Sequence, residues 1–122
     1  NKLVFHFDMQ PINVNNFFFI DTAKVVSLKL SLSPPAFICA SGNPIFKNDT
    51  VIRSDQDFNN FLMKTKNKHQ LIVIYGKDSK CSAAKALLYK FAINGYNNQL
   101  YYYFGSSEFS KFIHKTWYKQ QL

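Results

Sequence analysis

The feature that most constrains the fold is an alternation of apolar runs and amphipathic segments in the second half of the chain. The run Leu71–Tyr75 is continuous and rich in β-branched residues, which is typical of a strand buried on both faces. Residues 82–94 then place apolar side chains at helical spacing, and Gly95 suits the left-handed backbone that ends a helix. A second apolar run (99–104) and a second helical pattern (106–117) repeat this order. Short loops between such elements predict a parallel sheet with right-handed crossovers.

The first half of the chain carries similar runs, spaced less regularly. Residues 17–20 and 37–40 are short and apolar, and both predict further buried strands, the first of them buried on both faces. Residues 23–32 fit two structures, because apolar residues alternate over 26–32 as in a strand while the length also suits a short helix. Ser54 is placed to cap a helix that has an apolar stripe. We therefore predict an α/β fold of three layers, with a mainly parallel central sheet and helices on both faces.

Length and composition favour one folded domain. The chain has 122 residues, of which 47% are hydrophobic, so a core can form without disulfide bonds. It contains no internal repeat or low-complexity linker, and we expect a single domain over residues 1–122. At its start Leu3, Phe5 and Phe7 alternate with other residues, which predicts a strand and not a signal peptide. The first residue is not Met, so we expect a domain cut from a longer protein.

The charge balance favours an acidic partner. Fifteen Lys and Arg against seven Asp and Glu give a net charge of +8. Only Arg53 is an arginine and the lysines are spread along the chain, whereas readers of nucleic acids use arginine forks and concentrated basic patches. We expect a protein partner with an acidic surface, not a nucleic acid, and the candidate docking group is Lys64, Lys66 and Lys68. No apolar run approaches the roughly 20 residues of a membrane span, so no membrane association is expected.

The two cysteines, Cys39 and Cys81, fit a reduced intracellular protein better than a disulfide scaffold. We expect a cytoplasmic or nuclear location. No Cys or His pair has the spacing of zinc ligands, so neither a metal nor a cofactor is expected. Cys39 lies in an apolar run and is expected in the core.

The loop over residues 76–81 is the place where chemistry is expected. Ligands of open parallel sheets bind beyond the carboxyl ends of the strands, and this loop joins a buried strand to the start of a helix. The helix N-terminus and nearby lysines would stabilise a thiolate on Cys81. The candidate loop residues are Gly76, Lys77, Asp78, Ser79, Lys80 and Cys81.

Two stretches of the sequence resemble the rhodanese-like family. In the first, Phe18-Phe19-Ile20-Asp21 is similar to the family's strand that ends in an aspartate, and Pro34-Pro35-Ala36 is similar to its Pro-x-Ala turn. In the second, Ile72–Tyr75 is similar to the strand that delivers the active-site loop. The segment from Gly95-Tyr96 to Gly105-x-x-x-Phe109 resembles the family's closing segment. The likeness covers about residues 17–115, and it implies a rhodanese-like fold with a short helix over 23–31.

The departures from the family pattern fall on its active-site residues. In active rhodaneses the nucleophilic cysteine directly follows the aromatic residue of the strand, and here that position is Gly76. The basic residue expected at the end of the loop is Cys81, the arginine expected after the aspartate is Ala23, and the Gly-His before the turn is Ser31-Leu32. Glycine has no side chain to carry a persulfide or phosphocysteine, so the resemblance implies a catalytically silent domain. Silent members serve as regulatory or docking modules in MAP-kinase phosphatases and ubiquitin-specific proteases.

Three hypotheses of function follow from the sequence, and the third of them is a basic nucleic-acid binder whose binding would weaken steeply with salt. The leading hypothesis is a non-catalytic rhodanese-like module that binds a kinase or a ubiquitin-pathway protein. The alternative is a thiol-dependent enzyme, either a sulfurtransferase or a thioredoxin-like protein, with Cys81 as the nucleophile. His6, His69 and His114 all lie far from Cys81 in the sequence, so a catalytic Cys–His pair has no local signal.

Overall fold

The computed structural model describes residues 17–65, 70–78, 80–96 and 100–113. The predicted strand at Leu3–Phe7 lies outside the described residues. In chain order the elements are β1 (Phe17–Phe19), α1 (Thr22–Lys29), β2 (Ala36–Cys39), β3 (Thr50–Val51), α2 (Asp55–Lys64), β4 (Ile72–Tyr75), α3 (Ser82–Phe91), the π-helical turn η2 (Ala92–Tyr96), β5 (Leu100–Tyr103) and α4 (Ser106–Ile113).

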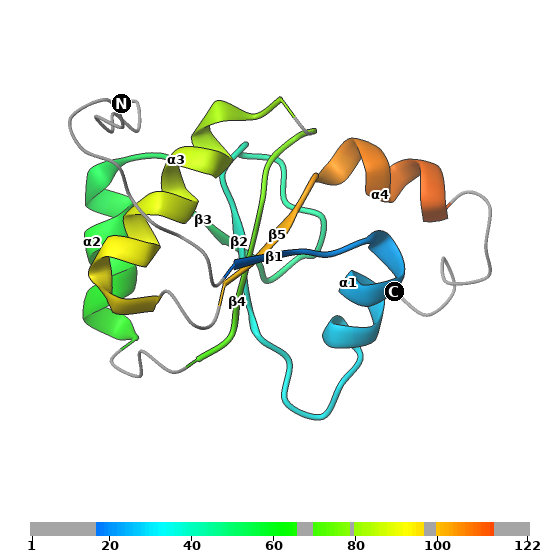
Figure 1. Cartoon of the computed structure of the whole chain (residues 1–122), viewed down its shortest axis with the longest axis horizontal. Helices are drawn as coiled ribbons and strands as arrows, with labels where there is room; N and C mark the ends of the chain where they lie inside the picture. The colour runs from blue at the N-terminus through cyan, green and yellow to red at the C-terminus, as the bar shows by residue number, and fades with distance from the viewer. Residues whose placement is uncertain (1–16, 66–69, 79, 97–99, 114–122) are drawn as a thin grey trace.

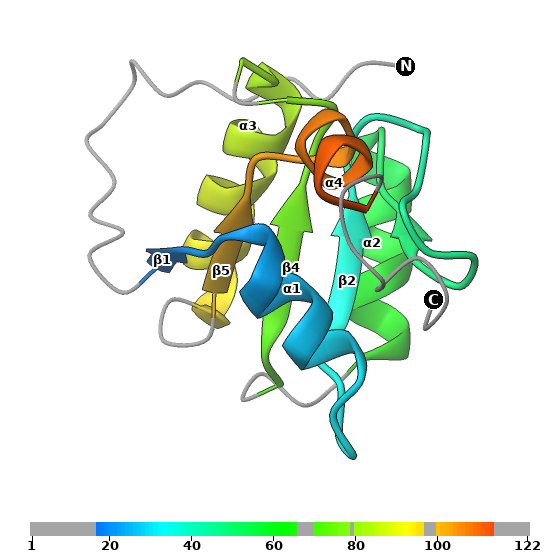
Figure 2. The ribbon, with the colours of Figure 1, turned by 90° about the vertical axis from the view of Figure 1, so that its right-hand side faces the viewer.

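The five strands of the described residues form one sheet in the order β1-β5-β4-β2-β3, and every neighbouring pair is parallel. Helices α2 and α3 cover one face of the sheet, and α1 and α4 cover the other (Figure 1). Figure 2 looks onto the face that α1 and α4 cover. The prediction of a three-layer α/β fold is confirmed, and the sheet is parallel throughout.

The central strand β4 divides the core into two halves. All four of its residues are buried, as the apolar run predicts. Ile72 and Ile74 pack toward α2 and α3, while Val73 and Tyr75 pack toward α1 and α4, because successive side chains of a strand point to opposite faces. Cys39 of β2, which pairs with Tyr75, is fully buried on the α1 and α4 side, so the prediction of a core cysteine is confirmed.

An aromatic cluster fills the core beneath α2 and α3. The Phe91 ring is fully buried, and its centroid lies 4.9 Å from that of Phe58, 5.5 Å from that of Phe61 and 5.2 Å from that of Tyr96. All three contacts are edge-to-face, the geometry that the ring quadrupoles favour. Phe91 therefore joins α2, α3 and η2 in one packed unit.

Side-chain caps start two of the helices. The Ser54 hydroxyl accepts a hydrogen bond from the backbone N–H of Asp57 at 3.1 Å, which confirms the predicted start of α2. Asp21 caps α1 in the same way through the N–H of Lys24 at 2.8 Å. Residues 22–29 are thus helical, and the alternation over 26–32 does not mark a strand. Its later members, Leu30 and Leu32, come after the end of the helix and are exposed.

The prediction that residues 17–20 are buried on both faces is wrong. Strand β1 lies at the edge of the sheet and pairs with β5, and in the described part of the chain no strand covers its other side. As a result 56% of Phe18 and 64% of Phe19 are exposed. Residues 17–20 are as apolar as β4, but β1 lies at the edge of the sheet whereas β4 lies at its centre.

Several boundaries differ from the predicted ones. Helix α3 ends at Phe91 and passes into η2, where Gly95 has a φ of 96° and so takes the left-handed conformation expected of it. Ser106 is the first residue of α4 and not its cap. Strand β3 has only two residues, too few to produce a recognisable pattern, and the sequence did not predict it.

We expect Phe91→Ala to lower the free energy of unfolding by about 3–5 kcal/mol, because it empties the centre of the aromatic cluster. Phe104→Ala is the matched control, since 43% of the Phe104 side chain is already exposed, and we expect it to cost well under half as much. Urea denaturation of both variants measures the two values. Equal losses would contradict the described core.

Candidate functional site

The loop after β4 is closed around position 76, where the rhodanese-like pattern has its nucleophile. A Cβ atom on Gly76 would lie 2.5 Å from Cβ of Cys81, closer still to its Sγ, and 3.2 Å from Cβ of Ala84. The Cys81 side chain therefore fills the space that a side chain at position 76 would need. The φ of Gly76 is not positive, so this position requires glycine for space and not for backbone conformation.

The turn before α4 closes the loop from the other side. The N–H of Ser106 donates to the carbonyl of Gly76 at 3.1 Å, and the N–H of Ser107 donates to the carbonyl of Lys77 at 2.9 Å. Gly105 has a φ of 131°, and a Cβ there would lie 2.6 Å from the carbonyl carbon of Gly76. The first N–H groups of α4 therefore donate to carbonyl groups of the loop. Free N–H groups at a helix N-terminus could bind an anion, but these two are already hydrogen-bonded.

The interior of the loop is held by Asp78. Its carboxylate accepts a hydrogen bond from the N–H of Lys80 at 2.9 Å, and its carbonyl accepts one from the N–H of Cys81 at 3.2 Å. Lys77 and Lys80 are exposed to solvent, and Ser79 lies outside the described residues. A carboxylate that takes a loop N–H competes with an anionic substrate or a persulfide for the same donors.

Cys81 is partly buried between Gly76 and the core beneath α3. It is the N-cap residue of α3, and its side chain makes no capping hydrogen bond. The three histidines that could act as a base, His6, His69 and His114, lie outside the described residues.

The Tyr102 hydroxyl is buried without a hydrogen-bond partner in the described structure. Burial is the main cause that raises the pKa of Tyr102, and the nearby charges of Cys81 and Asp78 raise it further.

A buried carboxylate on the other face of the sheet has no counterpart in the sequence predictions. The Asp49 side chain is fully buried and accepts hydrogen bonds from the Tyr75 hydroxyl, from Nζ of Lys29 at 3.3 Å and from the N–H of Phe46 at 3.3 Å. The Tyr75 hydroxyl in turn accepts from the N–H of Ile45 at 2.8 Å. Burial and the hydrogen bond to Asp49 raise the pKa of Tyr75 well above its usual value. This Asp49 network ties the loop between β2 and β3 to β4 and α1.

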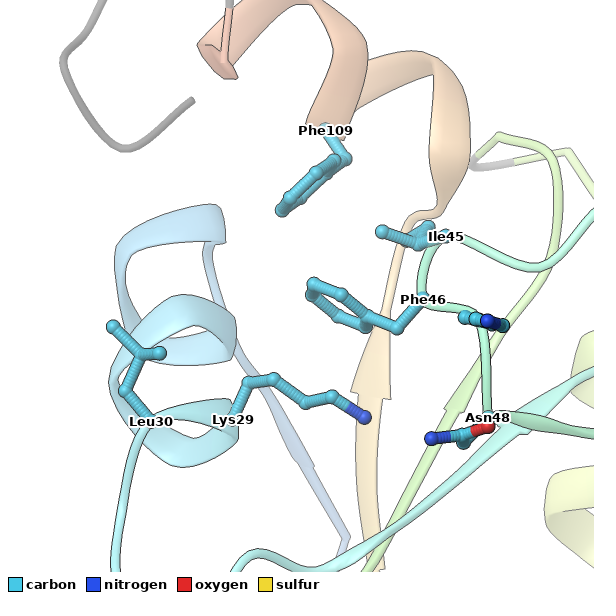
Figure 3. A pocket seen from close by; sticks show the side chains of 7 residues that line it. Lys29, Leu30, Ile45, Phe46, Asn48 and Phe109 are labelled. Atoms are coloured by element: carbon cyan, nitrogen blue, oxygen red, sulfur yellow. The ribbon is translucent and has the colours of Figure 1, made fainter. Parts of the chain in front are cut away.

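A surface pocket of about 370 Å³ lies beside the Asp49 network (Figure 3). It is formed by the end of α1, the loop between β2 and β3, and α4. Nζ of Lys29 lies 4.7 Å from the centroid of the Phe46 ring and 4.9 Å from that of Phe37, so its charge rests on two aromatic faces. The lining residues are Lys29, Leu30, Ile45, Phe46, Lys47, Asn48 and Phe109.

A second hollow, of about 390 Å³, lies at the carboxyl ends of β1 and β5 between Phe19, Phe104 and Glu108. The hydroxyls of Thr22 and Tyr103 hydrogen-bond to each other at its base. Its other carboxylate, that of Asp21, caps α1 through the N–H of Lys24.

The predicted docking lysines are only partly described. Lys64 is exposed at the end of α2 and borders a hollow of about 320 Å³ that also contains the carboxylate of Asp57. Lys66 and Lys68 lie outside the described residues. The structure therefore places one member of the group, at a hollow that an acidic residue also lines.

Among the described residues no three His, Cys, Asp or Glu side chains gather as metal ligands. None of the described helices has the length and apolar character needed to span a membrane. No family model, curated protein or solved structure matches the chain.

We expect Gly76→Ala to lower the free energy of unfolding by about 2–3 kcal/mol, because the new methyl group overlaps Cys81. In a Cys81→Gly background the substitution Gly76→Ala should cost less than about 1 kcal/mol, because residue 81 then has no side chain to overlap. In a Cys81→Ala background Gly76→Ala should cost more than in Cys81→Gly, because Cβ of residue 81 is itself too close to the new methyl group. A double-mutant cycle measured by urea denaturation tests this coupling. Additive effects would show that Cys81 does not occupy the space above Gly76.

We expect stability to fall as the pH rises above about 10. Burial raises the pKa of Tyr103 to about 12, and this exceeds the effect of the Thr22 hydrogen bond, which lowers it. Since the unfolded phenol titrates near 10, the stabilisation is complete below that pH and is lost as the pH approaches 12. Urea midpoints at several pH values, with phenolate absorbance at 295 nm, measure the loss. Tyr103→Phe should make the decline shallower, by up to about 1.4 kcal/mol per pH unit, and an unchanged slope would contradict the assignment.

Proposed function

We propose that this chain is a non-catalytic, rhodanese-like domain that acts inside the cell by binding another protein. The observation that carries the proposal is the contact between Cys81 and Gly76. A covalent transfer at this loop needs a thiolate at the focus of the loop N–H groups. Position 76 carries no side chain, and the one thiol nearby lies against it.

The rhodanese-like part of the proposal is supported by agreement between the family pattern and the local structure. The resemblance requires a helix after the aspartate of the first strand, and α1 begins directly after Asp21. It requires a loop between a buried strand and a helix at residues 76–81, and these residues join β4 to α3. The first of these agreements discriminates, because the alternation over 26–32 also allowed a strand.

The absence of catalysis is supported by what the loop groups already bind. Asp78 accepts hydrogen bonds from the N–H groups of Lys80 and Cys81. The carbonyl groups of Gly76 and Lys77 accept hydrogen bonds from the first N–H groups of α4. Donors used in this way do not stabilise a developing negative charge. The loop is a closed turn between β4 and α3, and the start of α4 is hydrogen-bonded to it.

The partner class follows from charge. With a net charge of +8, the chain attracts acidic proteins more than basic ones. The family resemblance points to a kinase or a ubiquitin-pathway protein as the partner. Most of the binding energy would come from a few apolar contacts, and the lysines would raise the association rate.

One observation favours the alternative, a thiol-dependent enzyme. Cys81 is the N-cap residue of α3 and is only partly buried, and a helix N-terminus favours a thiolate. The two hypotheses therefore differ in one measurable property, the reactivity of this thiol.

We expect the purified protein to show no transfer of sulfur from thiosulfate to cyanide and no hydrolysis of an aryl phosphate above the uncatalysed rate. Iodoacetamide should modify Cys81 no faster than it modifies glutathione, because the side chain lies against Gly76 and packs on the core beneath α3. Cys81→Ser is the control, and its far-ultraviolet circular dichroism should match that of the wild type. Turnover that Cys81→Ser abolishes would establish the enzyme and refute the proposal.

A further inference from the structure

We propose that the pocket beside the Asp49 network docks the partner, and that it takes an apolar side chain flanked by carboxylates. This inference rests on the proposed function and adds the surface and the chemistry of the ligand. At about 370 Å³ the pocket lies at the small end of the range for ligand sites, which suits one anchoring side chain of a peptide.

The floor of the pocket is apolar and rigid. The rings of Phe46 and Phe109 meet edge-to-face with centroids 5.3 Å apart, and Phe46 also packs on Phe37 at 5.6 Å. Both Phe46 and Phe109 are more than nine-tenths buried, so they offer a small, firmly held apolar surface. Leu30, half of it exposed, and Ile45 complete the apolar wall (Figure 3). Such walls fit a leucine, isoleucine or phenylalanine side chain.

The rim of the pocket is basic. Lys29 and Lys47 contribute two positive charges, and that of Lys29 is paired with the buried carboxylate of Asp49. Among the described residues, no acidic side chain lines this pocket. The ammonium group of Lys29 has three donors, and its hydrogen bond to Asp49 uses one of them. Its side chain keeps 27% of its surface exposed, so a partner carboxylate can reach it. The amide of Asn48 adds a neutral polar group at the same rim.

The Asp49 network holds these groups in place before anything binds. The backbone N–H groups of Ile45 and Phe46 are fixed by Tyr75 and Asp49, and Lys29 is fixed by Asp49 and two rings. Ordering loops and side chains is a main cost of association. A pocket whose walls are already ordered avoids part of that cost.

The other two hollows suit an acidic ligand less well. The one beside Lys64 contains Asp57, whose carboxylate already accepts the N–H of Arg53 at 3.0 Å. The one beside Phe19 contains Asp21 and Glu108, which would repel a carboxylate. Of these three, the pocket at Lys29 is the one that combines an apolar floor with a rim that carries two lysines and, among the described residues, no carboxylate.

Selection of displayed random 12-residue peptides against the wild-type protein tests the inference. We expect the selected peptides to share an apolar residue with Asp or Glu on both sides. The best of them, synthesised with a fluorophore, is then titrated by fluorescence polarisation. Lys47→Glu and Leu30→Glu should each raise the Kd at least about tenfold, because the first reverses a charge of the rim and the second places a carboxylate in the apolar wall.

Two matched variants control for charge and position. Lys64→Glu makes the same charge change at the lysine site predicted from the sequence, and Leu32→Glu makes the same substitution two residues beyond Leu30, at a fully exposed side chain. Both should bind within about twofold of the wild type, about 0.4 kcal/mol at most.

Failure of this inference is distinct from failure of the proposed function. Selection of basic peptides, no enrichment at all, or binding that Lys47→Glu and Leu30→Glu leave unchanged would overturn the pocket. Loss of binding in Lys64→Glu alone would overturn it as well and assign docking to the end of α2. The sulfurtransferase assay is independent of all these results, so turnover there would refute the proposed function whatever the peptides do.

Discussion

Three segments of the chain converge at the carboxyl end of the central strand, and they meet because residue 76 has no side chain. Cys81 at the start of α3 lies against its α-carbon, while the turn at Gly105 lies against its carbonyl group. The hydrogen bonds from Ser106 and Ser107 then fix α4 to the same loop. Helices α3 and α4 cover opposite faces of the sheet, so this junction fixes the starting point of one helix on each face.

This junction also occupies the place where open parallel sheets usually bind a ligand. In most open α/β folds the carboxyl edge of the strands binds a ligand, and a loop with free N–H groups is needed there. Here that loop is filled by the protein's own side chains and carbonyls. The polar groups best organised for recognition are instead beside the sheet, where Asp49, Lys29 and Tyr75 hold the loop between β2 and β3.

The sequence predicted the elements whose identity depends on local pattern. The buried strand β4, helix α3, the Ser54 cap and the left-handed Gly95 all follow from neighbouring residues, and the structure contains each of them. The loop at residues 76–81 was also located correctly, although nothing local showed that Cys81 would pack on Gly76.

What the sequence could not predict depends on residues far apart in the chain. The exposure of Phe18 and Phe19 follows from the place of β1 at the edge of the sheet, and strand order leaves no local signal. The Asp49 network joins α1, a loop and β4, and each member alone looks like an ordinary surface or strand residue. The pocket at Lys29 was missed for the same reason, since Phe109 reaches it from α4.

The pairing of β1 with β5 has a consequence for synthesis on the ribosome. The first described strand has its partner near the other end of the chain, with register Phe17 to Leu100. A nascent polypeptide that has emerged only as far as β4 has no β5 edge on which to place its aromatic first strand. Contacts of such long range slow folding, because a large loop must close first. Until the last strand emerges, the triple phenylalanine stays available to chaperones or to neighbouring chains.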